Sequence, residues 1–219
     1  MIVTMNNKFA EDIWALLGTV EARYGRAVKE KLVGVAEKLI DLHLRGIVKI
    51  NHSVMELVCA AYLASKGYEV DVEHPLGDPL VCDVYGSKGG GTVVVEIETG
   101  FTPPEHALDP LTYLRARIVS KVARYSAYAD RFILATPKYN ILEIHRALVK
   151  PPSKRTEHEL EEMKALCDLY YSRPPVTLEE LRNARLHSVI LIEVDFANVQ
   201  EFDPTEYRDG VNRSGLSKW

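Results

Sequence analysis

Three acidic residues in the middle of the chain have the spacing of a divalent metal site. Glu96 and Glu98 lie two positions apart in a β-branched run that predicts a strand at residues 92–98. Alternation along a strand places both carboxylates on one face, roughly 6.5–7 Å apart. Asp83 lies on the preceding predicted strand, and a two-residue turn at residues 89–90 would set it opposite Glu96, with Cβ atoms about 5 Å apart. Because opposed carboxylates repel each other, this arrangement predicts a cation between them.

Two further residues fall on predicted helices beside these acids. Glu56 lies on the apolar face of a helix predicted at residues 54–66, where a carboxylate is costly unless it is paired, solvated or bound to a metal. Ser53 precedes it at capping-box spacing, so a bond back to the start of the helix is an alternative that is compatible with a ligand role. Lys121 lies at the apolar edge of a helix predicted at residues 111–129, where its stem can be buried while its ammonium reaches the acids.

The helix that carries Lys121 also opens a basic segment. Residues 111–155 contain ten Lys or Arg residues and two acids, a net charge of +8, whereas the rest of the chain carries −12. Such asymmetry is typical of a face that binds a polyanion, although basic helices also balance acidic neighbours. The candidate phosphate contacts are Arg115, Arg117 and Arg124.

The elements that position these residues are predicted by hydrophobic periodicity. Residues 7–45 carry two apolar stripes at helical spacing, and Gly18 and Gly25 suggest a break between two helices. Short helices are expected from Thr156 and Thr177, each followed by a glutamate at capping-box spacing. The predicted strands cover residues 68–73, 80–85, 92–98, 132–135 and 188–194. We expect an α/β fold with an N-terminal helical extension (1–47), a core (48–200) and a C-terminal tail (201–219).

The composition, 47% hydrophobic and 26% charged residues, is that of a globular protein. No apolar run approaches the roughly 18 residues of a membrane span, and the first ten residues lack the apolar stretch of a secretion signal. The three cysteines are far apart and have no metal-site spacing. These features predict a soluble, cytoplasmic protein with no membrane partner. The N-terminal helices could pack on the core, form a homodimer or contact a ligand, and packing is the favoured role.

The order of a helix Glu, an Asp strand, a Glu-x-Glu strand, a basic helix and a strand resembles the PD-(D/E)xK nuclease superfamily over residues 53–135. The resemblance implies a restriction-endonuclease-like core, α-β-β-β-α-β, with a mixed sheet flanked by helices. It implies that Asp83, Glu96 and Glu56 bind Mg²⁺ or Mn²⁺ together with the backbone carbonyl of Ile97. The function it implies is metal-dependent hydrolysis of the phosphodiester bonds of DNA (or RNA), with DNA favoured.

Two positions depart from the pattern of that superfamily. Cys82 stands in place of the Pro before the Asp, at a position that is often variable. Glu98 stands where a Lys is usual, so the resemblance implies a lysine from another element, with Lys121 as the candidate and Lys88 as a weaker one. Either Lys121 or Glu98 would then orient the attacking water.

Three alternatives to a nuclease stay open. A catalytically inactive nuclease-fold protein would bind nucleic acid or another partner without cutting it. A hydrolase that uses Glu96 and Glu98 as an acid/base pair on a sugar would need aromatic residues beside the pair, and the sequence offers few. An interaction protein would work through its N-terminal helices. His52 and His106 lie near the site in the sequence, but no His pair has metal-ligand spacing, so we expect both to support the ligands at most.

Overall fold

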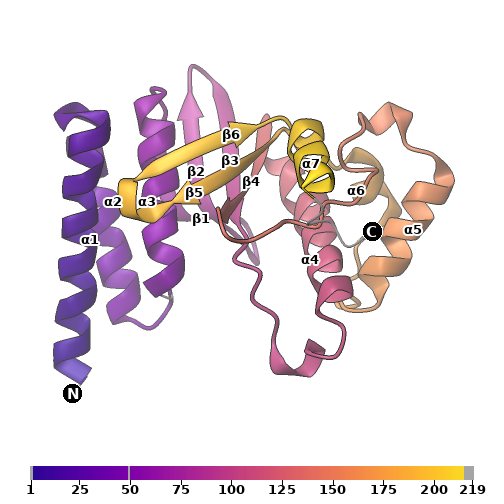
Figure 1. Ribbon diagram of the computed structural model, residues 1–219, viewed down its shortest axis with the longest axis horizontal. Coiled ribbons are helices and arrows are strands. Elements are labelled where there is room, and N and C mark those ends of the chain that lie inside the picture. The colour runs from indigo at the N-terminus through magenta and orange to yellow at the C-terminus, as the bar shows by residue number, and fades with distance from the viewer. Residues whose placement is uncertain (1, 49, 215–219) are drawn as a thin grey trace.

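The computed structural model describes residues 2–48 and 50–214, and a six-stranded mixed sheet lies at its centre (Figure 1). The order of the strands in the sheet follows their order in the chain; β3, β4 and β5 run parallel, and the other neighbours are antiparallel. The strands are β1 (Glu69–Gly77), β2 (Leu80–Lys88), β3 (Gly91–Ile97), β4 (Arg131–Pro137), β5 (Ser188–Glu193) and β6 (Asn198–Phe202). The expected α/β class, with a mixed sheet flanked by helices, is confirmed.

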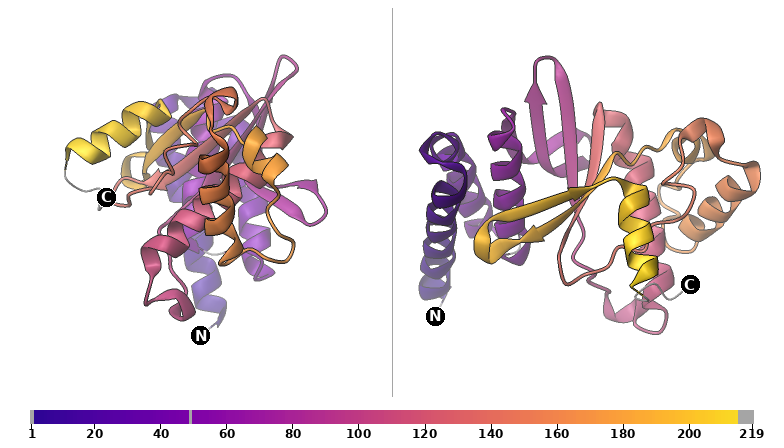
Figure 2. Two further views of the ribbon diagram at one scale, coloured as in Figure 1. Left: turned by 90° about the vertical axis from the view of Figure 1, so that its right-hand side faces the viewer. Right: turned by 45° about the horizontal axis from the view of Figure 1, so that its top comes forward.

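Helices cover both faces of this sheet (Figures 1 and 2). One buried cluster joins the sheet to α1 (Ile2–Tyr24), α2 (Arg26–Leu44) and α3 (Ile50–Ser65). A second cluster, on the opposite face, contains residues of α4 (Pro110–Tyr125), α5 (Glu157–Asp168), α6 (Leu178–Asn183) and α7 (Pro204–Arg213). Strand alternation distributes β3 between them, because Val93, Val95 and Ile97 belong to the first cluster and Val94 to the second.

The two predicted N-terminal helices are present, and the break between them lies at Gly25. Gly25 has a φ of +89°, a left-handed conformation that glycine adopts at little cost, whereas Gly18 lies within α1. Buried residues of α1 and α2 belong to the same cluster as α3 and the sheet. The expected extension of residues 1–47 therefore packs as a layer of the main core.

The C-terminal region differs from the expected tail. The boundary placed after residue 200 falls inside β6, which pairs antiparallel with β5, and α7 follows directly. The sequence of β6 shows no clear alternation because its residues are only partly buried at the edge of the sheet. Glu201 anchors this strand through contacts with Tyr62, Lys66 and Arg131.

The β2–β3 hairpin has the predicted two-residue turn. Gly89 and Gly90 have φ values of +56° and +84°, and the paired residues run from Lys88 with Gly91 to Val84 with Val95. This register is the one expected from the glycines. The backbone pairs end there, so Asp83 and Glu96 lie one step beyond the last pair.

The remaining elements are short. Both expected capping boxes are present, at Thr156 and Thr177. Within the described ranges, no helix has the length and apolar character needed to cross a membrane. The 3-10 turns are η1 (Pro104–His106), η2 (Ser126–Tyr128), η3 (Pro152–Lys154) and η4 (Val194–Phe196).

Candidate metal centre

The site is built where the hairpin strands stop pairing through their backbones. Asp83 N–H donates to Oε1 of Glu96 at 3.2 Å, and Ile97 N–H donates to Oδ2 of Asp83 at 2.5 Å. The two carboxylates thus replace the missing backbone partners across the hairpin. This exchange holds the two acids in place, and it satisfies two backbone donors inside the sheet.

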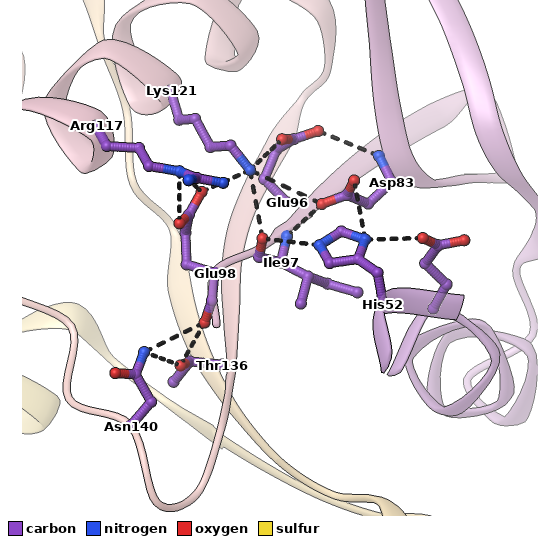
Figure 3. Close-up of polar contacts among 10 residues, drawn as sticks. His52, Asp83, Glu96, Ile97, Glu98, Arg117, Lys121, Thr136 and Asn140 are labelled. Carbon is purple, nitrogen blue, oxygen red and sulfur yellow. Dashed lines mark hydrogen bonds and ion pairs between the residues drawn. The ribbon is translucent and has the colours of Figure 1, made fainter. Parts of the chain in front are cut away.

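The cation expected between the acids is supplied in this structure by Lys121 of α4 (Figure 3). Its Nζ lies 2.9 Å from Glu96 Oε2, 2.6 Å from Glu98 Oε1 and 3.9 Å from Asp83 Oδ2. It also donates to the carbonyl oxygen of Ile97 at 3.3 Å. Burial alone would lower the pKa of Lys121, but the surrounding carboxylates raise it well above its usual value. Lys121 is therefore charged at neutral pH.

Glu98 is held by two cations. Arg117, one helical turn before Lys121, places Nε 2.9 Å from Oε2 and 3.1 Å from Oε1 of Glu98. The Glu98 side chain is 2% exposed, so its charge depends on these partners. The predicted proximity of Glu96, Glu98 and Lys121 is thus present, and all three lie on the α4 face of the sheet.

His52 of α3 approaches from the other face and has acceptors on both ring nitrogens (Figure 3). Its Nδ1 lies 2.9 Å from Glu56 Oε1 and 3.7 Å from Asp83 Oδ1, and its Nε2 lies 3.3 Å from the carbonyl oxygen of Ile97. Since carboxylates and carbonyls accept, the imidazole donates from both nitrogens and is positively charged. Burial alone would lower the pKa of His52, but the bond to Glu56 and the charge of Asp83 raise it to about 9.

Four side chains in the described part of the chain form a group that could hold a metal ion, here called the ligand group. Each offers one ligand atom, and these atoms lie within 4.8 Å of one another. One oxygen in the group, Oε2 of Glu56, is buried and has no hydrogen-bond partner among the residues that the structure describes. A buried carboxylate oxygen without a partner costs free energy that a bound cation would recover. The ligand group consists of His52, Glu56, Glu73 and Asp83.

Glu73 joins the ligand group through an unusual backbone conformation. Its φ is +45°, a left-handed value that costs a residue with a β-carbon roughly 1–2 kcal/mol. It lies in β1 between Val72 and His74, whose partners in β2 are Val84 and Cys82, so it is opposite Asp83. Backbone strain of this kind is concentrated at functional sites.

Three acids of the site, Glu56, Glu73 and Glu96, have raised pKa values. Burial raises the pKa of Glu56 to about 7 against the opposing effect of His52. Burial and the charge of Asp83 raise the pKa of Glu96. Burial and the same charge raise the pKa of Glu73. The protein therefore concentrates more negative charge here than its own cations fully stabilise.

The ligand group differs from the expected ligand set. Asp83 and Glu56 belong to the ligand group as expected, but Glu96 lies outside it and is bound by Lys121. The capping-box alternative for Glu56 does not apply, because α3 begins at Ile50, ahead of Ser53. His52, expected at most to support the ligands, and Glu73, which was not predicted, both belong to the ligand group. The i, i+4 spacing of His52 and Glu56 was a usable indication, since it places both on one helical face.

The three arginines predicted to contact phosphate lie in different surroundings. Arg117 reaches the site, whereas Arg115 lies 3.6 Å from the buried carboxylate of Glu143. Arg124 donates to the carbonyl of Pro174, and its guanidinium lies 5.7 Å from the ring centre of Tyr171. Of the three arginines, Arg117 is therefore the one that α4 directs toward the acids of the candidate metal centre.

A cavity of about 950 Å³ gives solvent access to the ligand group and is here called the site cavity. His52, Glu73 and Asp83 line it, and Arg117 and Phe101 form other parts of its wall. Its volume is near the upper end of the range for sites that enclose small organic ligands. The site cavity can therefore admit a sizeable substrate as well as an ion.

No family model, curated protein or solved structure matches the chain. The inference of function therefore rests on the geometry of the candidate metal centre.

Proposed function

We propose that the protein is a metal-dependent nuclease that hydrolyses phosphodiester bonds, with a restriction-endonuclease-like core of the PD-(D/E)xK type. The observation that carries this proposal is the position of the ligand group, which opens on the site cavity and lies next to a partly buried, charged lysine. Its unpartnered oxygen, Oε2 of Glu56, supports an ion as the missing partner. A carboxylate-rich group beside a lysine is suited to phosphoryl chemistry.

The donor set favours Mn²⁺ over Mg²⁺. Three carboxylates are hard oxygen ligands that both ions accept, whereas an imidazole suits Mn²⁺ better. His52, Glu56, Glu73 and Asp83 would hold the ion, and a bound divalent cation would polarise a phosphoryl oxygen and acidify a bound water. His52 must lose a proton before it can act as a ligand, so the affinity for metal should increase with pH.

The residues on the α4 side orient charge around the ligand group. Lys121 stays protonated through its contacts with Glu96 and Glu98, and its Nζ lies within 3.9 Å of Asp83. It is therefore placed to offset negative charge that develops on a phosphate at the ligand group. Glu98 aligns Lys121 and Arg117, since it binds both. In this proposal Lys121 takes the role of the lysine that enzymes of the PD-(D/E)xK superfamily usually carry where this chain has Glu98.

The non-catalytic alternative has one observation in its favour. The acids at positions 96 and 98 are paired with Lys121 and Arg117, and such a closed network is also what a decayed site would contain. A protein of that kind would bind nucleic acid through the same cavity without hydrolysing it. Metal-dependent cleavage separates the two functions.

The test is incubation of the purified chain with end-labelled single-stranded, duplex and branched DNA and RNA. Each substrate is tested with Mn²⁺, with Mg²⁺ and with EDTA. The proposal expects cleavage with Mn²⁺, weaker cleavage with Mg²⁺ and none with EDTA.

The matched variants are Asp83→Asn and Asp71→Asn, since both residues are acids of the β1–β2 hairpin. Asp71 binds Lys38 and His74 and lies outside the ligand group. Cleavage should disappear in Asp83→Asn and persist in Asp71→Asn. Absence of cleavage from every substrate in the parent chain, or equal cleavage by Asp83→Asn, contradicts the proposal.

A further inference from the structure

The turn that follows β3 is held by side chains of the neighbouring β4 segment (Figure 3). Thr136 Oγ1 donates to the carbonyl of Glu98 at 2.7 Å, and Asn140 Nδ2 donates to the same oxygen at 3.3 Å. Asn140 Nδ2 also donates to Thr136 Oγ1 at 2.8 Å. These bonds fix the backbone immediately after the candidate metal centre.

The turn depends on Gly100. Its φ is +76°, and a β-carbon there would lie 2.4 Å from Oδ1 of Asn140. A side chain at this position would therefore clash with the residue that holds the turn, and its backbone would also be strained. Because the backbone is fixed in this way, the position of the next residue, Phe101, is fixed as well.

Phe101 is an exposed aromatic residue between two cavities. It is 57% exposed and lines both the site cavity and a second cavity of about 570 Å³. Tyr139, which is 83% exposed, lines the second cavity as well. We call this second cavity the aromatic cavity. Two exposed aromatic rings thus continue the surface that begins at the ligand group.

We infer that Phe101 and Tyr139 stack on unpaired nucleobases, so that the substrate is single-stranded nucleic acid or an unpaired end. This inference rests on the proposed nuclease function and names the substrate class of the same site. Stacking on aromatic side chains is the common means of binding single strands, because an unpaired base exposes its faces. In a duplex these faces are already covered by neighbouring base pairs.

The charge of the aromatic cavity supports stacking over phosphate binding. Lys138, the one cation among the described lining residues, forms an ion pair with Glu193, and Asp195 adds a further negative charge to the lining. A duplex bound through its phosphates would need free cations there. Among the described lining residues, the wall offers aromatic faces and no excess of positive charge, which matches the bases of a strand better than its backbone.

The test measures binding in EDTA, so that its outcome is independent of cleavage. Single-stranded DNA that contains 2-aminopurine, the RNA of the same sequence and the corresponding blunt duplex are titrated with the parent chain. Binding is followed by anisotropy, and stacking is followed by quenching of 2-aminopurine. We expect the single strands to bind more tightly than the duplex and to be quenched.

Substitutions of Phe101 and Tyr139 test whether these two rings stack on the bases. Phe101→Ala and Tyr139→Ala should each weaken single-strand binding by about 5- to 100-fold, the effect typical of losing one stacked base. Phe101→Trp should retain binding and quenching, and Phe101→Leu should not. Phe196→Ala is the matched control, since Phe196 is 62% exposed and lines neither cavity. It should bind like the parent.

Three outcomes overturn the inference. One is tighter binding of the duplex, and another is equal binding by Phe101→Ala and the parent. The third is self-association of the chain that Phe101→Ala abolishes, which would make a second copy the occupant of this surface. A chain that binds single strands through Phe101 but never cuts retains this inference and loses the proposed nuclease function. A chain that cuts nucleic acid equally well with and without Phe101 retains the proposed nuclease function and loses this inference.

Discussion

The Nζ atom of Lys121 lies 2.6 Å from Oε1 of Glu98, a contact that connects helix α4 to the residue after strand β3. The Glu98 side chain is buried, and the Lys121 side chain is 18% exposed. A buried pair of this kind adds little stability while it is intact, but the loss of one partner leaves an uncompensated charge. Loss of the ammonium at position 121 should therefore lower the stability of the fold even in the absence of any metal.

Lys121→Met tests this dependence, since methionine keeps much of the packing of the stem and removes the ammonium. In EDTA at neutral pH, we expect the free energy of unfolding to fall by about 3–5 kcal/mol, because Glu96 and Glu98 lose their shared cation. Urea denaturation followed by circular dichroism measures it. Lys164→Met removes an exposed i, i+4 pair with Asp168 and should change the value by about 0.5 kcal/mol or less. Equal effects of the two substitutions would contradict the argument.

Asp83→Asn separates metal binding from folding. Its amide oxygen can still accept the N–H of Ile97, so the variant should unfold in EDTA at about the parent's temperature. Saturating Mn²⁺ should stabilise the parent, by about 2.7 kcal/mol at a hundredfold excess over Kd, and should not stabilise the variant. Thermal unfolding with and without Mn²⁺ measures both values. Asp71→Asn is the control and should retain the response to Mn²⁺; an Mn²⁺ response in Asp83→Asn contradicts the ligand assignment.

Glu73→Gly tests whether backbone strain is maintained for the ligand group. Glycine accepts a φ of +45° without the steric cost that a β-carbon imposes. This gain offsets the destabilisation caused by the greater conformational entropy of glycine in the unfolded chain. The variant should match the parent's stability in EDTA, or exceed it by about 1 kcal/mol, while its Mn²⁺ affinity falls at least about tenfold. Calorimetry gives the affinity. Glu73→Ala keeps the strain and should lose affinity without that gain; a marked loss of stability in Glu73→Gly alone would show that Glu73 has a structural role.

Arg117→Ala and Arg124→Ala should have different effects on nucleic-acid binding. Arg117 lines the site cavity, whereas Arg124 is engaged with Pro174 and Tyr171 away from it. Removing one phosphate contact reduces the slope of log K against log salt by about 0.7–0.9. We expect this reduction for Arg117→Ala and none for Arg124→Ala, measured by anisotropy over a series of salt concentrations. The opposite result would move the binding surface to the other side of α4.

Glu201→Gln tests the anchor of the C-terminal strand through its pH dependence. Burial alone would raise the pKa of Glu201, but hydrogen bonds from Lys66, Ser188 and Tyr62 lower it to about 2. A lowered pKa in the folded state stabilises the protein at pH values above the ordinary pKa of glutamate, and this contribution is lost as the pH falls toward 2. At pH 7 the variant should be less stable by roughly 1–3 kcal/mol. The difference should shrink steadily below about pH 4.5.

Urea denaturation at several pH values gives the comparison for Glu201. The control is Glu69→Gln, which removes a mainly exposed ion pair with Lys31 and should have an effect of about 0.5 kcal/mol or less at each pH. A destabilisation by Glu201→Gln that stays constant from pH 7 to pH 3 would indicate that the charge of the carboxylate is not what anchors β6.

Local patterns were sufficient for the hairpin and for the faces of its residues. A strand alternates sides with every residue, and Gly89 and Gly90 favour a two-residue turn, so the register and the common face of Glu96 and Glu98 follow from short-range rules. The periodicity of α4 likewise placed Lys121 beside the acids. The α/β class follows from the alternation of helical and strand segments along the chain.

Tertiary packing alone decided which acids gather around one point. Glu73 joins the ligand group because it has a left-handed conformation in β1, opposite Asp83. His52 joins the group because α3 packs on the other face of the sheet, where His52 reaches Asp83 and the carbonyl of Ile97. The spacing of His52 and Glu56 was a local indication for that pair, but the approach of the pair to Asp83 and Glu73 depends on contacts between elements far apart in the chain. The edge strand β6 was missed for the same reason: it has no periodic apolar face, and its residue Glu201 binds Tyr62, Lys66 and Arg131 from other elements. The sequence therefore predicts on which face of an element a charged side chain lies, but the packing of the helices on the sheet determines which residues it contacts.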